Sequence, residues 1–157
     1  MKVIKLNDLL EWRDDVKSKG ETIALTNGCF DLVHVGHLRS IEKAASYADH
    51  LVVAVNADES IRKLKGAKRP ICNEGDRSEL IAGFRCVSRV VLFNEMRLTN
   101  IIETLLPDYY LKGGDYTLEK LDVAERAALE KVRSKIKFFP IVEGVSTTDL
   151  VEKIQSL

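Results

Sequence analysis

Two histidines and a glycine stand close together in the stretch NGCFDLVHVGH, which covers residues 27–37. His34 and His37 are three residues apart, so on a helix they would share one face. The unpaired amides at the start of such a helix attract an anion, and Gly36 leaves the backbone open to a bulky ligand. Two imidazoles beside a phosphate could stabilise the charge that grows in a transition state. The stretch therefore predicts a phosphate site with catalytic histidines.

The residues before the histidines form the predicted loop of this site. Gly28 follows an apolar run and permits a tight turn or a positive φ. The Asp31 carboxylate can accept hydrogen bonds from backbone amides and so fix the loop. A zinc site is an alternative, because Cys29, His34 and His37 are possible ligands, but no fourth ligand is near in the sequence. We expect no metal ion held by the protein itself.

A second cluster is basic and lies in IRKLKGAKRP, residues 61–70. Lysine offers a mobile point charge to a phosphate, whereas arginine offers a planar fork. Lys65 is the first candidate for a phosphate contact and Lys63 the second, although a solvated loop would explain the same charges. Arg77, near the start of the next helix, either contacts substrate or lies on the helix surface.

Two further stretches are rich in glycine and hydroxyl side chains. In LKGGDY, residues 111–116, the glycine pair lets the backbone approach a ligand and Asp115 can accept from a ribose or a base. In EGVSTTDL, residues 143–150, hydroxyls at a helix start can bind a phosphate or only cap the helix. The candidates in these stretches are Lys112, Gly113, Asp115, Ser146, Thr147 and Thr148.

Five apolar runs alternate with helical patterns and would position these residues. The expected strands are 22–27, 51–55, 89–93, 109–114 and 135–142, and the second lacks polar alternation, which is typical of a sheet covered on both faces. The order predicts a single α/β domain over residues 1–157, with a doubly wound, five-stranded parallel sheet and an N-terminal helical extension over 1–20. Ligands bind such sheets at the carboxyl ends of the strands. We expect four segments to meet there: 26–37, 56–69, 112–115 and 144–148.

Composition narrows the class of protein. The chain has 157 residues, and 24 basic residues balance 24 acidic ones, which argues against a general nucleic-acid binder. Three cysteines without a CxxC pair indicate reduced thiols. No apolar stretch approaches the length of a membrane span, and the charged N-terminus does not resemble a signal peptide. We expect a cytoplasmic protein that binds neither membranes nor nucleic acid.

The stretch NGCFDLVHVGH resembles the signature of the HxGH nucleotidyltransferase superfamily, which has a Rossmann-like fold. The resemblance implies transfer of a nucleotidyl group from a nucleoside triphosphate to a phosphorylated acceptor, with in-line attack and release of pyrophosphate. It implies catalytic roles for His34, His37 and Lys65. It also implies a nucleotide site at Asn27, Gly28, Cys29, Phe30, Gly36, Lys112, Gly113, Asp115, Ser146, Thr147 and Thr148, and an acceptor site at Asp31, Asn56, Lys63, Arg69 and Arg77.

Further stretches, among them VVAVNADESIRKLKG and RPICNEGDR, are similar to the heptose 1-phosphate adenylyltransferases. This resemblance implies ATP and D-glycero-β-D-manno-heptose 1-phosphate as substrates, Mg²⁺ with the triphosphate, and a homodimer. A CTP-dependent glycerol-3-phosphate cytidylyltransferase is the alternative, because it shares GVSTT and a similar length. A nucleotide-binding module without catalysis is the alternative of another class, although it would not need paired histidines.

Overall fold

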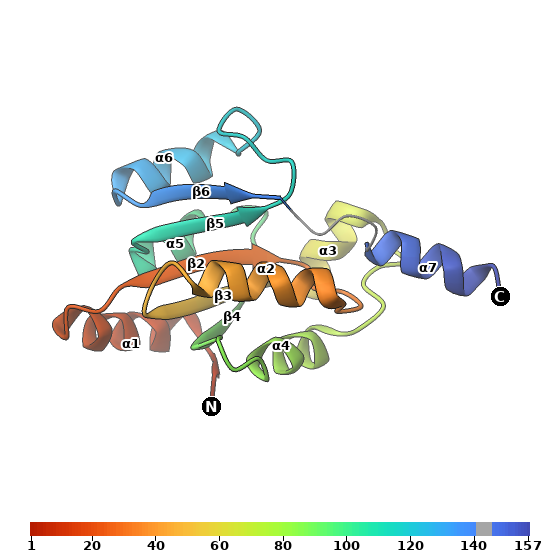
Figure 1. The fold of residues 1–157 in the computed structure, drawn as a ribbon, viewed down its shortest axis with the longest axis horizontal. Coiled ribbons are helices and arrows are strands. Elements are labelled where there is room, and N and C mark those ends of the chain that lie inside the picture. The colour runs from red at the N-terminus through yellow and green to blue at the C-terminus, as the bar shows by residue number, and fades with distance from the viewer. Residues whose placement is uncertain (141–145) are drawn as a thin grey trace.

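A parallel sheet of six strands forms the centre of the protein. The computed structural model describes residues 1–140 and 146–157. The strands lie in the order β1-β4-β3-β2-β5-β6, and every neighbouring pair is parallel. Their carboxyl ends therefore share one edge, and Figure 1 shows the arrows of β5 and β6 pointing toward the side where α3 and α7 lie. The strands are β1 (Val3–Ile4), β2 (Ile23–Gly28), β3 (His50–Asn56), β4 (Arg89–Phe93), β5 (Tyr109–Gly113) and β6 (Lys135–Phe139).

Seven helices are described, and most of them connect successive strands. From β2 the chain adds β3 and β4 on one side of the sheet and then β5 and β6 on the other, so the direction in which strands are added reverses between β2 and β5. This is the switch point at which doubly wound sheets bind ligands. The helices are α1 (Leu6–Ser18), α2 (Val35–Ala45), α3 (Asp58–Lys65), α4 (Glu74–Ala82), α5 (Thr99–Leu105), α6 (Val123–Lys131) and α7 (Thr147–Gln155).

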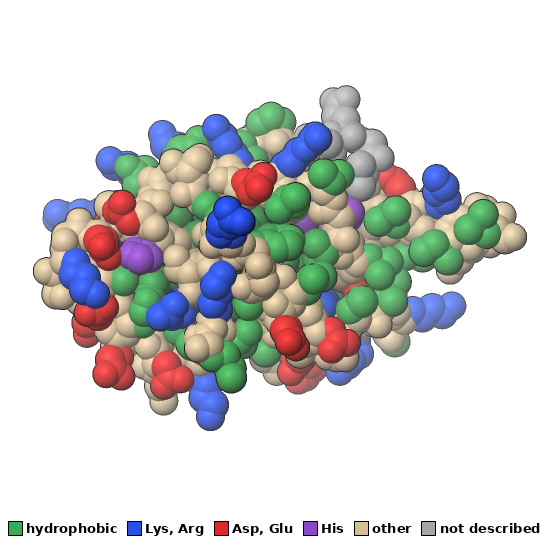
Figure 2. Space-filling view, turned by 60° about the horizontal axis from the view of Figure 1, so that its bottom comes forward, with side chains coloured by type: hydrophobic (Ala, Val, Ile, Leu, Met, Phe, Trp, Pro, Cys, Tyr) green, Lys and Arg blue, Asp and Glu red, His purple; other side chains and the backbone are tan. Residues whose placement is uncertain are grey.

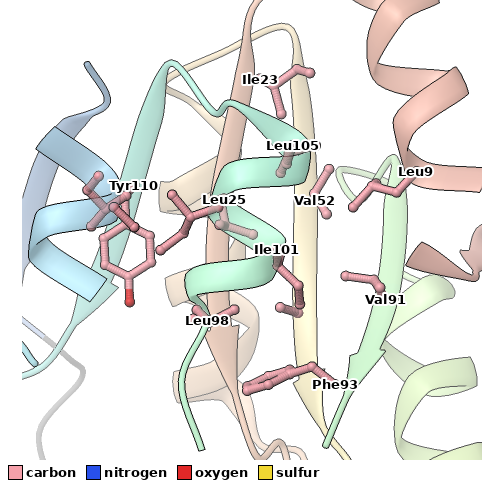
Figure 3. Packing of buried hydrophobic residues seen from close by; sticks show 14 of the residues in the cluster. Leu9, Ile23, Leu25, Val52, Val91, Phe93, Leu98, Ile101, Leu105 and Tyr110 are labelled. Carbon is pink, nitrogen blue, oxygen red and sulfur yellow. The ribbon is translucent and has the colours of Figure 1, made fainter. Parts of the chain in front are cut away.

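Two apolar cores cover the two faces of the sheet. On one face, α1, α5 and α6 pack on alternate residues of the central strands; Leu98, Ile101 and Leu105 lie over Leu25 and Val52 (Figure 3). On the other face, α2 and α4 pack against the alternate strand residues, among them Ala24, Val53 and Val55. The central strands are apolar on both faces because both faces are covered, as the lack of polar alternation in residues 51–55 predicted.

The sheet has one strand more than the five expected. Val3 and Ile4 pair with Val90 and Val91 of β4, so the N-terminal segment extends the sheet as well as adding a helix. Two residues carry no periodicity, which is why the sequence did not indicate this strand. The helix α1 follows directly, with Lys5 at its cap position and no side-chain hydrogen bond there.

Two connections differ from the expectation. Residues 58–65 form the helix α3, so much of the basic cluster lies on a helix rather than in a solvated loop. Its sequence is mostly charged, and only Ser60 and Ile61 are buried, so its apolar pattern is weak. The last expected strand, 135–142, is described as β6 up to Phe139, and residues 141–145 lie outside the described part of the chain.

Candidate active site

A cavity of about 560 Å³ lies at the carboxyl edge of the sheet, at the switch point between β2 and β5. Residues from β2, β3, β5, α3, α6 and the start of α7 line it. Eleven residues expected at the site are among them: Asn27, Gly28, Cys29, Phe30, Asp31, His37, Asn56, Lys65, Lys112, Gly113 and Thr147. Each of the four segments expected to meet thus contributes to one cavity. Of the last segment, 144–148, residues 144 and 145 lie outside the described part of the chain.

The two histidines close the first turn of α2, which begins one residue after His34. The His34 Nδ1 accepts from the amide of Gly36 at 3.1 Å, and the His37 Nδ1 accepts from the amide of His34 at 3.3 Å. This is the reciprocal arrangement of a capping box, with imidazoles in place of the usual side chains. The rings lie with their centroids 3.9 Å apart. His37 lines the cavity, and the ring of His34 lies against the His37 ring.

These hydrogen bonds fix the tautomer of both rings. A neutral imidazole has one donor and one acceptor nitrogen, so each ring that accepts at Nδ1 carries its proton at Nε2. Burial, the neighbouring His34 and the charge of Lys65 together lower the pKa of His37 to about 4, and burial also lowers the pKa of His34. At neutral pH the pair therefore presents two Nε2–H donors without a net charge.

Gly28 owes its place to a close contact rather than to a turn with positive φ. A Cβ added there would lie 3.1 Å from the ring of Phe30. The positive φ values of this loop belong to Phe30 and Leu32, at 49° and 50°. The Phe30 ring in turn meets the edge of the His37 ring, with centroids 5.5 Å apart. The loop thus packs an aromatic ring against both the strand end and the histidine.

Asp31 ties the histidine loop to two other segments. Its carboxylate accepts from the amides of Ile71 and Cys72 at 3.0 Å and pairs with Arg69 at 2.8 Å. Its backbone carbonyl accepts from the Thr147 hydroxyl at 2.7 Å. The expected hydrogen bonds from backbone amides are present, although the donors come from residues 71–72 and not from the loop itself. Asp31 therefore holds the loop after α3 and the start of α7 against the site.

The basic cluster divides into charges that face the cavity and charges that do not. Lys65, the last residue of α3, lines the cavity and is close enough to His37 to lower its pKa. Lys63 points elsewhere and pairs with Glu59 at 2.8 Å on the exposed side of α3. Arg69 is the partner of Asp31. Of the lysines in this cluster, Lys65 is the one at the cavity wall.

Arg77 is buried, forms hydrogen bonds to several segments and does not line the cavity. Only 1% of its surface is exposed, and its guanidinium donates to the carbonyls of Cys29, Asn56 and Cys72 and to the Asp58 carboxylate. These partners belong to the ends of β2 and β3 and to the starts of α3 and α4. The interpretation as a surface residue is wrong, and the guanidinium is committed to protein oxygens beneath the site.

Side chains of β2 and β5 form a polar floor. The Asn27 Oδ1 accepts from the Lys112 Nζ at 2.8 Å and from the Tyr110 hydroxyl at 3.0 Å. The hydroxyl tip of Tyr110 points away from the aliphatic cluster around it (Figure 3). The Lys112 ammonium also lies 5.0 Å from the centre of the Tyr116 ring, and burial lowers its pKa. On β3, Asn56 is buried and donates to the Ser60 hydroxyl.

The remaining expected residues lie beside the cavity rather than in its wall. Asp115 is 95% exposed and pairs with Lys120 at 2.8 Å. Ser146 caps α7, accepting from the Asp149 amide at 3.0 Å, and Thr148 is exposed on the first turn of that helix. Gly36 is buried inside α2. The positive φ of this region is at Gly114, at 123°, one residue beyond the wall residue Gly113.

The sequence reasoning missed the wall opposite the histidines. This wall is built by the loop after β4 and by the approach to α6, whose charged pattern resembled an ordinary solvated helix. A signal was available in the topology, because any residue that follows β4 or precedes α6 must lie near the carboxyl edge. The residues missed there are Phe93, Met96, Arg97, Tyr116, Lys120, Leu121, Asp122 and Glu125, and Leu64 on α3 was missed as well.

The described residues contain no group of three or more His, Cys, Asp or Glu side chains that could hold a metal ion. A divalent cation at this site would therefore take most of its ligands from phosphate oxygens and water. None of the described helices has the length and apolar character of a membrane span. On the face shown in Figure 2, basic and acidic side chains are interspersed.

The chain is similar to a known family and to proteins of known sequence. Residues 25–153 match the cytidylyltransferase-like family. The chain is 43% identical over 140 residues to the bifunctional protein HldE of Geotalea uraniireducens and 41% identical over 153 residues to that of Geobacter metallireducens. These matches cover 89% and 98% of the chain but only 28% and 31% of the relatives, so the chain spans about a third of their length or less.

Two solved structures share the fold. The crystal structure of the lipopolysaccharide core biosynthesis protein from Thermoplasma volcanium has a TM-score of 0.63 and 28% identity, covering 78% of this chain and 98% of that one. Pantoate-beta-alanine ligase from Francisella tularensis, complexed with beta-gamma ATP and beta-alanine, has a TM-score of 0.61. At 12% identity, covering 100% of this chain and 78% of that one, it shows the Rossmann-like fold alone. The chain belongs to the cytidylyltransferase-like family of nucleotidyltransferases.

Proposed function

We propose that this protein transfers AMP from ATP to D-glycero-β-D-manno-heptose 1-phosphate, giving ADP-heptose and pyrophosphate. The observation that carries the proposal is the pair of neutral imidazoles at the start of α2, with two Nε2–H donors beside a cavity that Lys65 also lines. The family match supports nucleotidyl transfer. The similarity to the HldE proteins and to a lipopolysaccharide core biosynthesis protein supports the choice of a sugar phosphate.

The proposed reaction is a single displacement at the α-phosphorus of ATP. An oxygen of the acceptor phosphate forms a bond to this phosphorus, and the bond to the bridging oxygen of the β-phosphate breaks. Pyrophosphate leaves with that electron pair, and no covalent enzyme intermediate forms. Negative charge that develops on the phosphoryl oxygens is stabilised by the histidine donors and by Lys65, which are already in place before the reaction. Mg²⁺ bound to the triphosphate would neutralise charge on its phosphate oxygens.

The other site residues take supporting roles in this proposal. The start of α2 and the hydroxyl of Thr147 face the triphosphate, and Asp31 keeps these two segments together. Arg77 positions the ends of β2 and β3 without touching substrate. We extend the proposal to Gly113 and Lys112 as neighbours of the nucleotide, since both line the cavity beside Asn27.

A crossed assay tests the proposal. ATP, CTP, GTP and UTP are each combined with heptose 1-phosphate, hexose 1-phosphates and glycerol 3-phosphate, and pyrophosphate release is measured. We expect the highest kcat/KM for ATP with the heptose. Turnover of CTP with glycerol 3-phosphate alone would instead identify the cytidylyltransferase alternative, which shares the same mechanism. Nucleotide binding without pyrophosphate release from any pair would identify a binding module.

A further inference from the structure

The cavity contains a carboxylate that the proposed mechanism does not use. Glu125 lies in the first turn of α6, and only 9% of its surface is exposed. Its Oε1 accepts from the amide of Leu98 at 3.0 Å, which ties the loop after β4 to α6. Its Oε2 has no hydrogen-bond partner among the described residues, and it is not one of the buried polar atoms sealed from solvent. One oxygen is thus structural, and the other remains accessible in a residue that lines the cavity.

An ionised carboxylate restricts which groups of a ligand can bind beside it. It only accepts hydrogen bonds, so its ligand must be a donor, and it repels a phosphate. Leaving a buried charge without a partner is costly, so a ligand that supplies one gains affinity. Glu125 therefore suits a neutral, hydrogen-bond-donating part of a substrate and not a phosphate group.

The surroundings of Glu125 fit a sugar with several hydroxyl groups. Apolar side chains of Phe93, Met96 and Leu121 line the same cavity, and Lys112 adds a hydrogen-bond donor from the floor. Polar groups that converge beside apolar side chains are typical of small-molecule sites. In such a site a pyranose can lay its C–H surface on the apolar side chains while its hydroxyls reach the charged groups.

The position of Glu125 across the sheet favours the acceptor over the nucleoside. The histidines belong to α2 on one face of the sheet, whereas α6 packs on the other face. An adjoining cleft of about 210 Å³ lies on the α2 side, lined by Ile41 and Phe139 and sharing Gly28 and Gly113 with the main cavity, and it offers room for the nucleoside away from Glu125. In-line attack places the acceptor on the side of the α-phosphorus opposite pyrophosphate, so nucleoside and acceptor need different walls of the site.

We infer that Glu125 is a specificity-determining residue that binds hydroxyl groups of the acceptor sugar through its free oxygen. The inference rests on the proposed function, because it assigns part of the same site. It gives a role to a buried acid in the wall of a cavity whose other features suit phosphate chemistry. It also predicts a preference for polyhydroxylated acceptors over acceptors with a single short polyol arm.

The test uses Glu125→Gln, which keeps an oxygen for the Leu98 amide but replaces the free carboxylate oxygen. We expect the KM for heptose 1-phosphate to rise about 10- to 100-fold, as for loss of a hydrogen bond to a charged group, with the KM for ATP unchanged. Glu130→Gln on the same helix is the matched control, because Glu130 is exposed and pairs only with Arg126. We expect this control to match the wild type.

Deoxy analogues of the acceptor identify the hydroxyl. Removal of the hydroxyl that Glu125 binds should lower kcat/KM about 10-fold or more in the wild type and have little effect in Glu125→Gln. An unchanged KM for the sugar, or a rise in the KM for ATP instead, would overturn the inference, and the latter would assign Glu125 to the nucleoside. If Glu125→Gln does not fold, Glu125→Asp, which withdraws the charge by one methylene, provides the same KM comparison.

The failure of this inference is distinguishable from failure of the proposed function. A wild-type enzyme that uses ATP and the heptose, with no KM change in Glu125→Gln, would contradict the role of Glu125 alone. A wild-type enzyme that uses only another hydroxylated acceptor would contradict the proposed substrate. The KM of that acceptor in Glu125→Gln would then decide the role of Glu125, with a rise supporting it and no change overturning it.

Discussion

The His34 amide donates to the Nδ1 of His37, and the His34 ring accepts from the same helical turn at Gly36. The histidines thus have a structural task, the capping of α2, as well as the proposed catalytic one. Substitution by alanine would remove both, since losing a cap costs about 1 kcal/mol of stability. A clean test needs side chains that cap the helix but lack an imidazole.

His37→Gln and His34→Ser meet this need, because glutamine three residues after a serine cap is a natural capping box. We expect both variants to melt within a few degrees of the wild type and to lose about 10²–10³ in kcat, which is typical for removal of one transition-state donor. Thermal denaturation and pyrophosphate release provide the two readouts. Near-normal kcat in a stable variant would refute the catalytic role of that histidine.

The low pKa of His37 predicts a pH dependence of stability. An unfolded histidine titrates near 6.5, whereas burial holds the pKa of His37 at about 4 in the folded protein. Between these values the unfolded chain binds more protons, so the free energy of unfolding should fall as the pH drops from 6.5 toward 4. Urea denaturation across this range measures the slope, and His37→Gln should reduce it.

Nuclear magnetic resonance can examine the same residue directly. The ring nitrogen shifts of His37 should report a proton on Nε2 at pH 7 and no titration above pH 5. A ring that titrates near pH 6.5, or that carries its proton on Nδ1, would contradict the hydrogen-bond arrangement at the start of α2.

Lys65 and Lys68 offer a matched pair within the basic cluster. Lys65 lines the cavity, whereas Lys68 lies in the exposed connection after α3. We expect Lys65→Ala to lower kcat/KM at least 10-fold more than Lys68→Ala, with the difference maintained at high salt because a contact inside the site is poorly screened. Equal small effects that vanish with salt would assign both lysines to a solvated surface.

Substitution of Arg77 can distinguish a structural role from a contact with substrate. Arg77→Met should destabilise the protein by about 3–5 kcal/mol, because it leaves the Asp58 carboxylate and three carbonyls without their donor in a buried site. Urea denaturation measures this loss. A stable variant with a raised KM for the acceptor would instead support the contact that the family resemblance implied.

Regular features were predictable from sequence because they have periodicity. The apolar strands β2 and β3 and the helix that begins after His34 follow from patterns several residues long. The strand Val3–Ile4 is too short to have a pattern, and α3 buries only two of its residues. The place of this short strand in the sheet depends on its pairing with β4, which is far away in the sequence.

The site was predictable only where a motif marks it. The NGCFDLVHVGH stretch indicated the histidine loop, and Asp31 was expected to accept backbone amides, but its donors at residues 71–72 became evident only in three dimensions. Arg77 and Glu125 show the limit most clearly. Nothing in their neighbouring residues tells that the arginine is buried under the site or that the glutamate lines it.

Transfer of an isotope from the acceptor tests the central claim most directly. Heptose 1-phosphate labelled with ¹⁸O in its phosphate is incubated with ATP and Mg²⁺, and the products are examined by ³¹P magnetic resonance and mass spectrometry. The account predicts ADP-heptose with ¹⁸O in the bridge between its two phosphorus atoms, together with unlabelled pyrophosphate. Labelled pyrophosphate, an unlabelled bridge in ADP-heptose, or release of orthophosphate in place of pyrophosphate would contradict it.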